Sequence, residues 1–260
     1  MTKNRIQKLF QEKNESILSV FYTAGFPKLN DTVSIGVALE KAGADLIEVG
    51  IPFSDPVADG PTIQDSNKIA LDNGINVKLI LAQVRELRSK VKLPIILMGY
   101  LNPVLQYGME AFVKDAGAAG VDGFIFPDMP WFDYEGEYKS LFDANNLSAI
   151  FLIAPTTSSE RIQRIDAASN AFIYAVSASS TTGARQGFDD DQLAYFQRLK
   201  EKKLKNPFLI GFGISNRETF QTASSYGAGA IVGSAFVKML KESKDITRDT
   251  ETFVKELKTK

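Results

Sequence analysis

The chain has 260 residues, of which 44% are hydrophobic and 23% are charged, and its formal net charge is −1 at pH 7. This composition is ordinary for a soluble globular protein, and the absence of a basic field disfavours binding to nucleic acid or to an anionic membrane. The sequence contains no cysteine and no histidine, so disulfides and thiolate or imidazole metal sites are excluded, and any acid–base chemistry would depend on carboxylates, tyrosine or lysine.

Two features of the sequence argue against export and membrane insertion. No apolar signal core follows residues 1–6. The longest small and apolar stretch, residues 228–237, is far too short to cross a bilayer. We therefore predict a cytoplasmic protein without a membrane partner.

Short apolar, β-branched runs recur along the chain and alternate with amphipathic helical patterns, as expected for strands that are buried on both faces of a parallel sheet. The eight runs are Ile17–Thr23, Asp45–Val49, Pro94–Met98, Gly123–Phe126, Ala149–Ile153, Phe172–Val176, Phe208–Gly211 and Ala230–Val232. Eight such units without a linker predict an α/β fold, a closed (β/α)8 TIM barrel, as a single domain over residues 1–260. Helical patterns at 2–13 and 247–258 predict an extra helix at each terminus.

Local signals predict where several helices begin and end. Thr157 with Glu160 and Ser215 with Glu218 have the spacing of capping boxes, each after a predicted strand. Gly43, Gly120 and Gly227 stand where helices are expected to end in a left-handed residue.

Active sites of (β/α)8 barrels lie at the carboxyl ends of the strands, where the second predicted strand carries Glu48. Alternation along this strand directs Leu46 and Glu48 into the barrel, and Ile47 and Val49 toward the helices. A carboxylate in an apolar barrel mouth loses hydration, which raises its pKa and suits a general acid–base group. A solvated glutamate at the end of a strand is an equally good interpretation of the residue alone.

Asp59 follows a long loop segment, residues 52–58, which has the character of a stiff lid held by prolines, and loops of this length are usually functional or disordered. Pro61 has the character of a first helical residue, so Asp59 alone is most simply interpreted as the cap of that helix.

The last three strands are followed by segments rich in small residues. Residues 177–187 form either a mobile lid or a flexible surface loop. The turns Gly211–Ser215 and Gly233–Ser234 each open a helix, and their backbone N–H groups favour a phosphate site over simple tight turns. Aromatic residues at strand starts and ends suit either core packing or a flat slot for an aromatic ring. These aromatic residues are Phe21, Tyr100, Tyr174 and Phe212.

Taken in order, these motifs resemble the tryptophan synthase alpha subunit family over the whole chain. The most specific motif is EVGIPFSDPVADGP, Glu48 to Pro61, and it is supported by FYTAGFP, MGYLNP, YAVS with TTG, and GFGIS with GSA. The resemblance implies a carbon–carbon lyase that cleaves indole-3-glycerol phosphate to indole and glyceraldehyde 3-phosphate.

Matching residue by residue, the resemblance implies that Glu48 is the acid–base group and that Asp59 accepts the indole N–H. It implies that Thr182 positions Asp59, and that Asp55 faces a partner. The implied indole pocket is lined by Phe21, Tyr100, Tyr174 and Phe212. The implied phosphate cradle consists of Gly183, Gly213, Gly233 and Ser234. The loop after the sixth strand departs from the family pattern at Ala178, commonly arginine, and at Ser180, commonly glycine.

The resemblance also implies a β-subunit partner in an α2β2 complex, with pyridoxal phosphate on that partner and neither cofactor nor metal on this chain. Two alternatives remain open at this point. One is another phosphate-binding barrel enzyme, although the predicted strands contain no lysine for Schiff-base chemistry. The other is a chain that mainly activates its partner.

Overall fold

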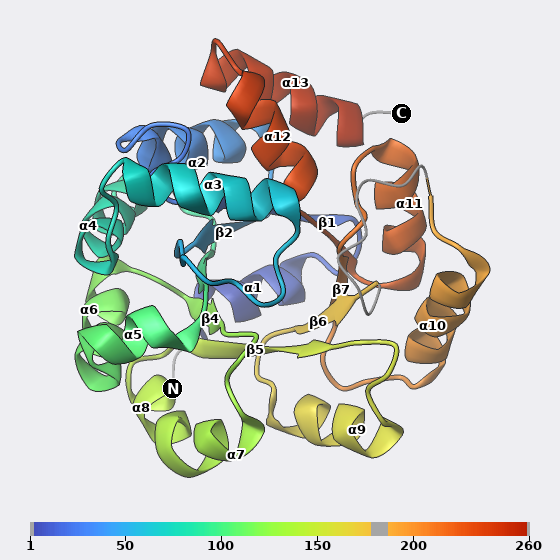
Figure 1. Ribbon diagram of the computed structural model, residues 1–260. Coiled ribbons are helices and arrows are strands. Elements are labelled where there is room, and N and C mark those ends of the chain that lie inside the picture. The colour runs from blue at the N-terminus through green and yellow to red at the C-terminus, as the bar shows by residue number, and fades with distance from the viewer. Residues whose placement is uncertain (1–2, 178–186, 259–260) are drawn as a thin grey trace.

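A computed structural model describes residues 3–177 and 187–258. Eight parallel strands form a closed barrel in chain order, surrounded by helices (Figure 1). The strands are β1 (Ile17–Thr23), β2 (Leu46–Gly50), β3 (Ile95–Met98), β4 (Gly123–Ile125), β5 (Ser148–Ile153), β6 (Ile173–Val176), β7 (Phe208–Gly211) and β8 (Gly229–Val232). The predicted (β/α)8 barrel is therefore confirmed, with each strand close to its predicted bounds.

The helical layer covers the outside of the barrel. Its helices are α2 (Asp31–Ala42), α3 (Pro61–Asp72), α4 (Val77–Arg88), α5 (Leu101–Tyr107), α6 (Met109–Ala119), α7 (Trp131–Asp133), α8 (Lys139–Ala144), α9 (Ser159–Ala168), α10 (Asp190–Glu201), α11 (Arg217–Tyr226) and α12 (Ser234–Glu242). A π-helical segment, Tyr134–Tyr138, joins α7 to α8.

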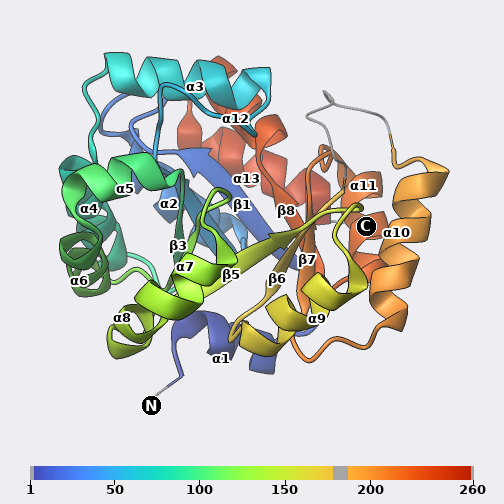
Figure 2. The ribbon, with the colours of Figure 1, turned by 60° about the horizontal axis from the view of Figure 1, so that its bottom comes forward.

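Both predicted terminal helices are present, as α1 (Arg5–Glu12) and α13 (Ile246–Lys258). Ile6 and Phe10 of α1 belong to the apolar cluster inside the barrel, and the Phe10 ring lies 5.4 Å from that of Phe172, just before β6. Helix α1 thus closes the amino-terminal end of the barrel, opposite α3 in Figure 2. Helix α13 packs against α2 and α12.

Side chains of the strands divide between two cores, as alternation requires. Leu46 and Ile96 belong to the cluster inside the barrel, whereas Ile47 and Val49 pack into the larger cluster beneath the helices. This division confirms the predicted facing of β2 and places Glu48 on the inward side.

Acidic residues near the amino-terminal ends of the strands tie neighbouring units together. Asp122 accepts the backbone N–H of Ile95 at 2.9 Å and pairs with Arg5 and Arg88, each at 3.0 Å. Asp45 pairs with Lys13 at 2.7 Å and with Lys258 at 2.9 Å, beyond α1 and at the end of α13. This end of the molecule is therefore built for stability and leaves the carboxyl end to carry the site.

Helix boundaries differ in detail from those the sequence predicts. Helix α9 is capped by Ser158, one residue after Thr157, and α11 is capped by Asn216, which forms its capping box with Thr219. Both predicted capping boxes were therefore one residue early. Gly43 and Gly120 do adopt the left-handed conformation. Gly227 instead has an extended φ of −110°.

Candidate active site at the carboxyl end of the barrel

Glu48 lies inside the barrel on β2 and is fully buried. One carboxylate oxygen, Oε1, accepts a hydrogen bond of 2.6 Å from the hydroxyl of Ser19 on the adjacent strand β1. The other, Oε2, is buried and has no hydrogen-bonding partner in the described part of the chain. A solvated glutamate at a strand end, the alternative interpretation, is therefore wrong.

Burial decides the protonation of Glu48. Loss of hydration raises the pKa of its carboxyl from 4.5 to about 7, and the Ser19 hydrogen bond acts in the opposite direction. A carboxyl with this pKa is present in both protonation states at neutral pH. It can therefore give a proton to a reacting group and also take one back.

Asp59 lies at the end of the loop that follows β2. The residue before the first turn of α3 is Gly60, and no side chain caps that helix, so the interpretation of Asp59 as a cap is wrong; Pro61 is the first helical residue, as predicted. The Asp59 carboxylate accepts a hydrogen bond of 3.3 Å from the buried Asn67, one turn further along α3. Burial raises the pKa of Asp59, and hydrogen bonds with Asn67 and Tyr100 lower it.

Tyr100 connects this loop to the end of β3. Its hydroxyl accepts a hydrogen bond of 2.9 Å from the backbone N–H of Ala58, beside Asp59. The ring lies 5.6 Å from the ring of Phe53 in the same loop. Burial raises the pKa of the Tyr100 hydroxyl to about 12, so it stays protonated and can donate a hydrogen bond. The loop that carries Asp59 is thereby anchored over the third unit of the barrel.

Phe21, Tyr174 and Phe212 also lie at this end of the barrel. The ring of Phe21 covers Gly50, where a Cβ would lie 2.6 Å from the ring. The rings of Tyr174 and Phe212 meet edge to face at 6.2 Å. Burial, together with the nearby carboxylates of Glu48 and Asp59, raises the pKa of Tyr174. The two acids and the aromatic residues thus share one region.

The turns after β7 and β8 lie beside each other because these strands are paired. Phe212 and Gly213 have consecutive positive φ values of 69° and 76°. The carbonyl of Phe212 accepts a hydrogen bond of 2.8 Å from the Ser177 hydroxyl, which fixes this turn. Helix α12 begins at Ser234, directly after Gly233, so its first backbone N–H groups have no partner within the helix and suit an anion.

Two predicted residues, Thr182 and Gly183, lie outside the described residues, as do Ala178 and Ser180. Asp55 is exposed in the loop after β2 and accepts a hydrogen bond from the Ser54 hydroxyl.

The model of the family "Tryptophan synthase alpha chain" matches residues 7–260. The chain belongs to the tryptophan synthase alpha chain family. Among named tryptophan synthase alpha chains, that of Parabacteroides distasonis is 54% identical over 92% of this chain and 93% of its own length. That of Flavobacterium psychrophilum is 53% identical over 92% and 94%.

Solved structures of this family have the same fold. The tryptophan synthase alpha chain of Legionella pneumophila superposes with a TM-score of 0.88 at 34% identity, covering 98% of this chain and 96% of its own. A chain from a Mycobacterium tuberculosis tryptophan synthase structure gives 0.88 at 33% identity, covering 98% and 97%.

Two residues of this tryptophan synthase alpha chain site were not predicted. Ser19 contacts Glu48, and Asn67 contacts Asp59. Ser19 could have been noticed as a hydroxyl that lies between two apolar residues on the predicted first strand, in step with the alternation of its inward face. For Asn67, the sequence gives no signal of a contact with Asp59, because the helix face on which Asn67 lies depends on where α3 begins.

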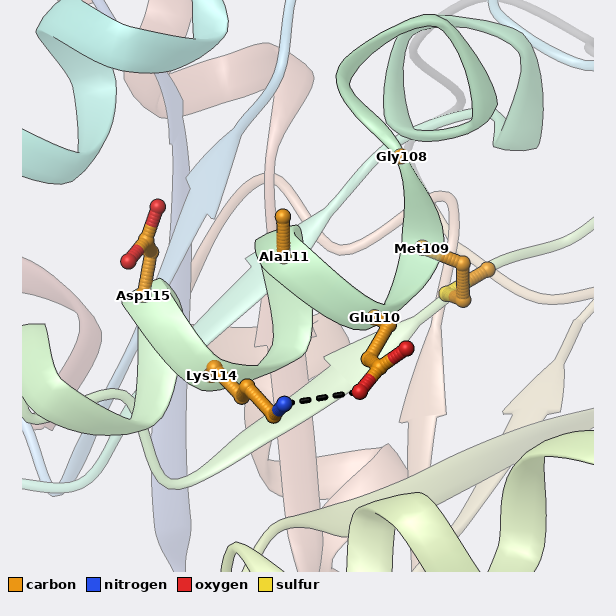
Figure 3. A pocket seen from close by; sticks show the side chains of 6 residues that line it. All are labelled: Gly108, Met109, Glu110, Ala111, Lys114 and Asp115. Carbon is orange, nitrogen blue, oxygen red and sulfur yellow. Dashed lines mark hydrogen bonds and ion pairs between the residues drawn. The ribbon is translucent and has the colours of Figure 1, made fainter.

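Two surface hollows lie among the outer helices, and neither contains a residue of a barrel strand. The first, on α6, includes an ion pair of 2.7 Å between Lys114 and Glu110, both largely exposed (Figure 3). The second lies between α9 and α10. Neither hollow is lined by a buried carboxyl group, so the barrel mouth remains the candidate active site.

Proposed function

We propose a two-carboxylate mechanism for the reaction of this family, the cleavage of indole-3-glycerol phosphate to indole and glyceraldehyde 3-phosphate. As a tryptophan synthase alpha chain, the protein is a carbon–carbon lyase of tryptophan biosynthesis. Glu48 is the acid–base group, and Asp59 accepts a hydrogen bond from the indole N–H.

The proposed proton transfers balance within one active site. Protonated Glu48 gives its proton to C3 of the indole ring, and the positive charge that develops on the ring is stabilised by the Asp59 carboxylate. The Glu48 carboxylate then removes the proton of the glycerol hydroxyl next to the scissile bond. The electrons of that O–H bond form the aldehyde, while those of the broken carbon–carbon bond restore the neutral indole. Glu48 ends protonated, as it began.

The observation that carries this proposal is the state of Glu48. It is a fully buried carboxyl with one oxygen hydrogen-bonded and the other without a partner, and its pKa is about 7. Buried polar groups without a partner are rare in proteins, and strongly perturbed pKa values cluster at functional sites.

The same geometry supports the proposed substrate-binding groups. Phe21, Tyr100, Tyr174 and Phe212 supply apolar area for the indole ring. Gly213, Gly233 and Ser234 supply backbone N–H groups for the phosphate, at the paired ends of β7 and β8. The roles of Thr182 and Gly183 stay predictions from the resemblance.

The family implies a tryptophan synthase β subunit as partner. The proposed docking surface is the rim formed after β2, β3 and β4, where Asp55 lies. Apolar side chains on this rim are unusually exposed, as expected for an interface. They are Val57 (91% exposed), Leu105 (51%) and Phe132 (78%). We propose an α2β2 assembly in the cytoplasm, with pyridoxal phosphate on the β subunit.

Across the part of the chain that the structure describes, every helix is too short or too polar to cross a bilayer.

An assay of the purified chain tests the proposal. Incubation with indole-3-glycerol phosphate should release indole and glyceraldehyde 3-phosphate in equal amounts, and addition of a β subunit should increase the rate. If the chain releases no indole either alone or with a β subunit, the proposal is wrong. Activity that appears only in the complex would favour the alternative role as an activator of the partner.

A further inference from the structure

Ser19 is the buried hydroxyl that contacts Glu48 directly. It lies in β1 between Leu18 and Val20, is fully buried, and donates to Oε1 of Glu48 at 2.6 Å. An isolated hydroxyl among apolar residues weakens strand packing unless it makes a hydrogen bond. The family comparison assigns no role to this residue, so its contact with Glu48 calls for a physical explanation.

The strand register shows what the contact does to the carboxylate. Ser19 pairs with Leu46, whereas Glu48 pairs with Phe21, one inward-facing layer nearer the carboxyl end. The hydrogen bond therefore holds Oε1 back toward the layer of Ser19. Oε2 is left as the buried oxygen without a partner.

We propose that Ser19 is a positioning residue that holds Oε1 of Glu48, so that Oε2 alone exchanges the proton with the substrate. This inference rests on the proposed role of Glu48. Without the Ser19 hydrogen bond, the Glu48 carboxyl group would be free to rotate, and its two oxygens would compete for the position next to the substrate.

The surroundings of Glu48 contain few other groups that could control it. Its register partners on β1 and β3 are Phe21 and Ile96, which are apolar. The Tyr174 hydroxyl on β6 lies close enough to Glu48 and Asp59 that their negative charges contribute to its raised pKa. Within the described residues, burial and the Ser19 hydrogen bond are the two influences on the pKa of Glu48. Removal of the Ser19 hydroxyl should therefore raise that pKa further.

The test compares S19A with S19T, which keeps a hydroxyl, and with the matched control S148A. Ser148 is also a fully buried serine at a strand, but its hydroxyl accepts from Asn4 at 2.8 Å near the amino-terminal end of the barrel. Two quantities are measured for each variant. One is the pH profile of indole release. The other is the titration of the Glu48 carboxyl by ¹³C NMR on glutamate-labelled protein, with the Glu48 signal identified by its absence from E48Q.

In S19A, we expect the Glu48 midpoint to rise by roughly half a pH unit to one unit, as for loss of one hydrogen bond to a buried carboxylate. We expect kcat at pH 7 to fall about ten-fold with KM nearly unchanged. S19T should keep the wild-type midpoint and most of the rate, and S148A should change neither.

An unchanged Glu48 midpoint in S19A, in an enzyme that depends on Glu48, would overturn this inference alone. Equal shifts in S19A and S148A would also overturn it, because the effect would then follow from any lost buried hydroxyl. Full activity of E48Q would overturn the proposed role of Glu48, and this inference with it.

Discussion

Besides its proposed role in the reaction, the buried Glu48 makes the free energy of unfolding depend on pH. Its pKa in the folded state, about 7, lies above the usual 4.5 because the side chain is buried. The folded protein thus binds this proton more tightly than the unfolded chain does. The stability that Glu48 contributes is fully present below about pH 4.5 and is lost as the pH rises through 7.

E48Q tests this linkage, since the amide cannot ionise. Above pH 7, the free energy of unfolding of E48Q should exceed that of the wild type by about 3 kcal/mol. The difference should vanish near pH 4. Urea unfolding of both proteins at the two pH values measures it. A difference that does not change with pH would contradict the burial of an ionisable carboxyl at this position.

Asn67 is the residue that most directly orients Asp59, through a hydrogen bond of 3.3 Å. N67A should lower kcat about ten-fold, because one hydrogen bond to the carboxylate is lost. The same substitution in the D59N background should have little further effect, since the partner is already changed. Steady-state kinetics of the wild type, N67A, D59N and the double variant gives the coupling between Asn67 and Asp59. An equal loss of kcat in both backgrounds would show that Asn67 does not act through Asp59.

Among the elements, the strands were predictable, whereas the side-chain caps of α9 and α11 were each misplaced by one residue. Buried parallel strands are continuous apolar runs, so their positions follow from composition alone. The cap of α9 was misplaced because Thr157 and Ser158 are both hydroxyl residues. Thr157 accepts from the backbone N–H of Ala154 at 2.9 Å, within the turn before the helix. Ser158 accepts from Arg161 and caps the helix. Sequence alone does not decide between two adjacent hydroxyls.

The site was predictable in part for the same reason. Alternation along β2 places Glu48 inside the barrel, and the resemblance assigns it a role. The contact of Ser19 with Glu48 joins two strands, and it depends on the register between β1 and β2. That register follows from closure of the whole barrel, which no local pattern encodes.

Asp122 links several elements at the amino-terminal end of the barrel. It is buried and pairs with Arg5 of α1 and Arg88 of α4. D122A should destabilise the protein by about 3 kcal/mol, because Arg88 would remain largely buried without its partner. The kcat of the folded variant should stay unchanged. Denaturant unfolding and the indole assay check both parts, and a large loss of kcat in folded D122A would contradict the separation of the two ends.

At the scale of the whole molecule, stability and chemistry occupy opposite ends of one barrel. Ion pairs and the terminal helix α1 close the amino-terminal end, and the two acids lie toward the carboxyl end. Three exposed apolar residues, Val57, Leu105 and Phe132, follow β2, β3 and β4 at that same carboxyl end. A partner bound there would lie beside the loop that carries Asp59. That residues 1–260 fold as a single domain stays a prediction.

Phe132 tests the docking surface, since its ring is 78% exposed on α7. F132S should weaken binding of the β subunit about ten-fold or more, as for loss of an aromatic residue at an interface. Indole release by the isolated chain should not change. Leu71, also exposed but on α3, provides the control L71S. Titration calorimetry with a β subunit measures both, and equal affinity of F132S and wild type would place the partner elsewhere.

In the proposed mechanism, the buried carboxyl of Glu48 carries the proton. The most direct measurement is the initial rate of indole release at pH 7 by E48Q, with E86Q as control. Glu86 is an exposed residue of α4 and pairs with Lys90, just beyond the end of that helix, so E86Q should cleave indole-3-glycerol phosphate at the wild-type rate. E48Q should lose activity by about a thousand-fold while remaining folded. An E48Q rate within ten-fold of the wild type would contradict the proposed mechanism.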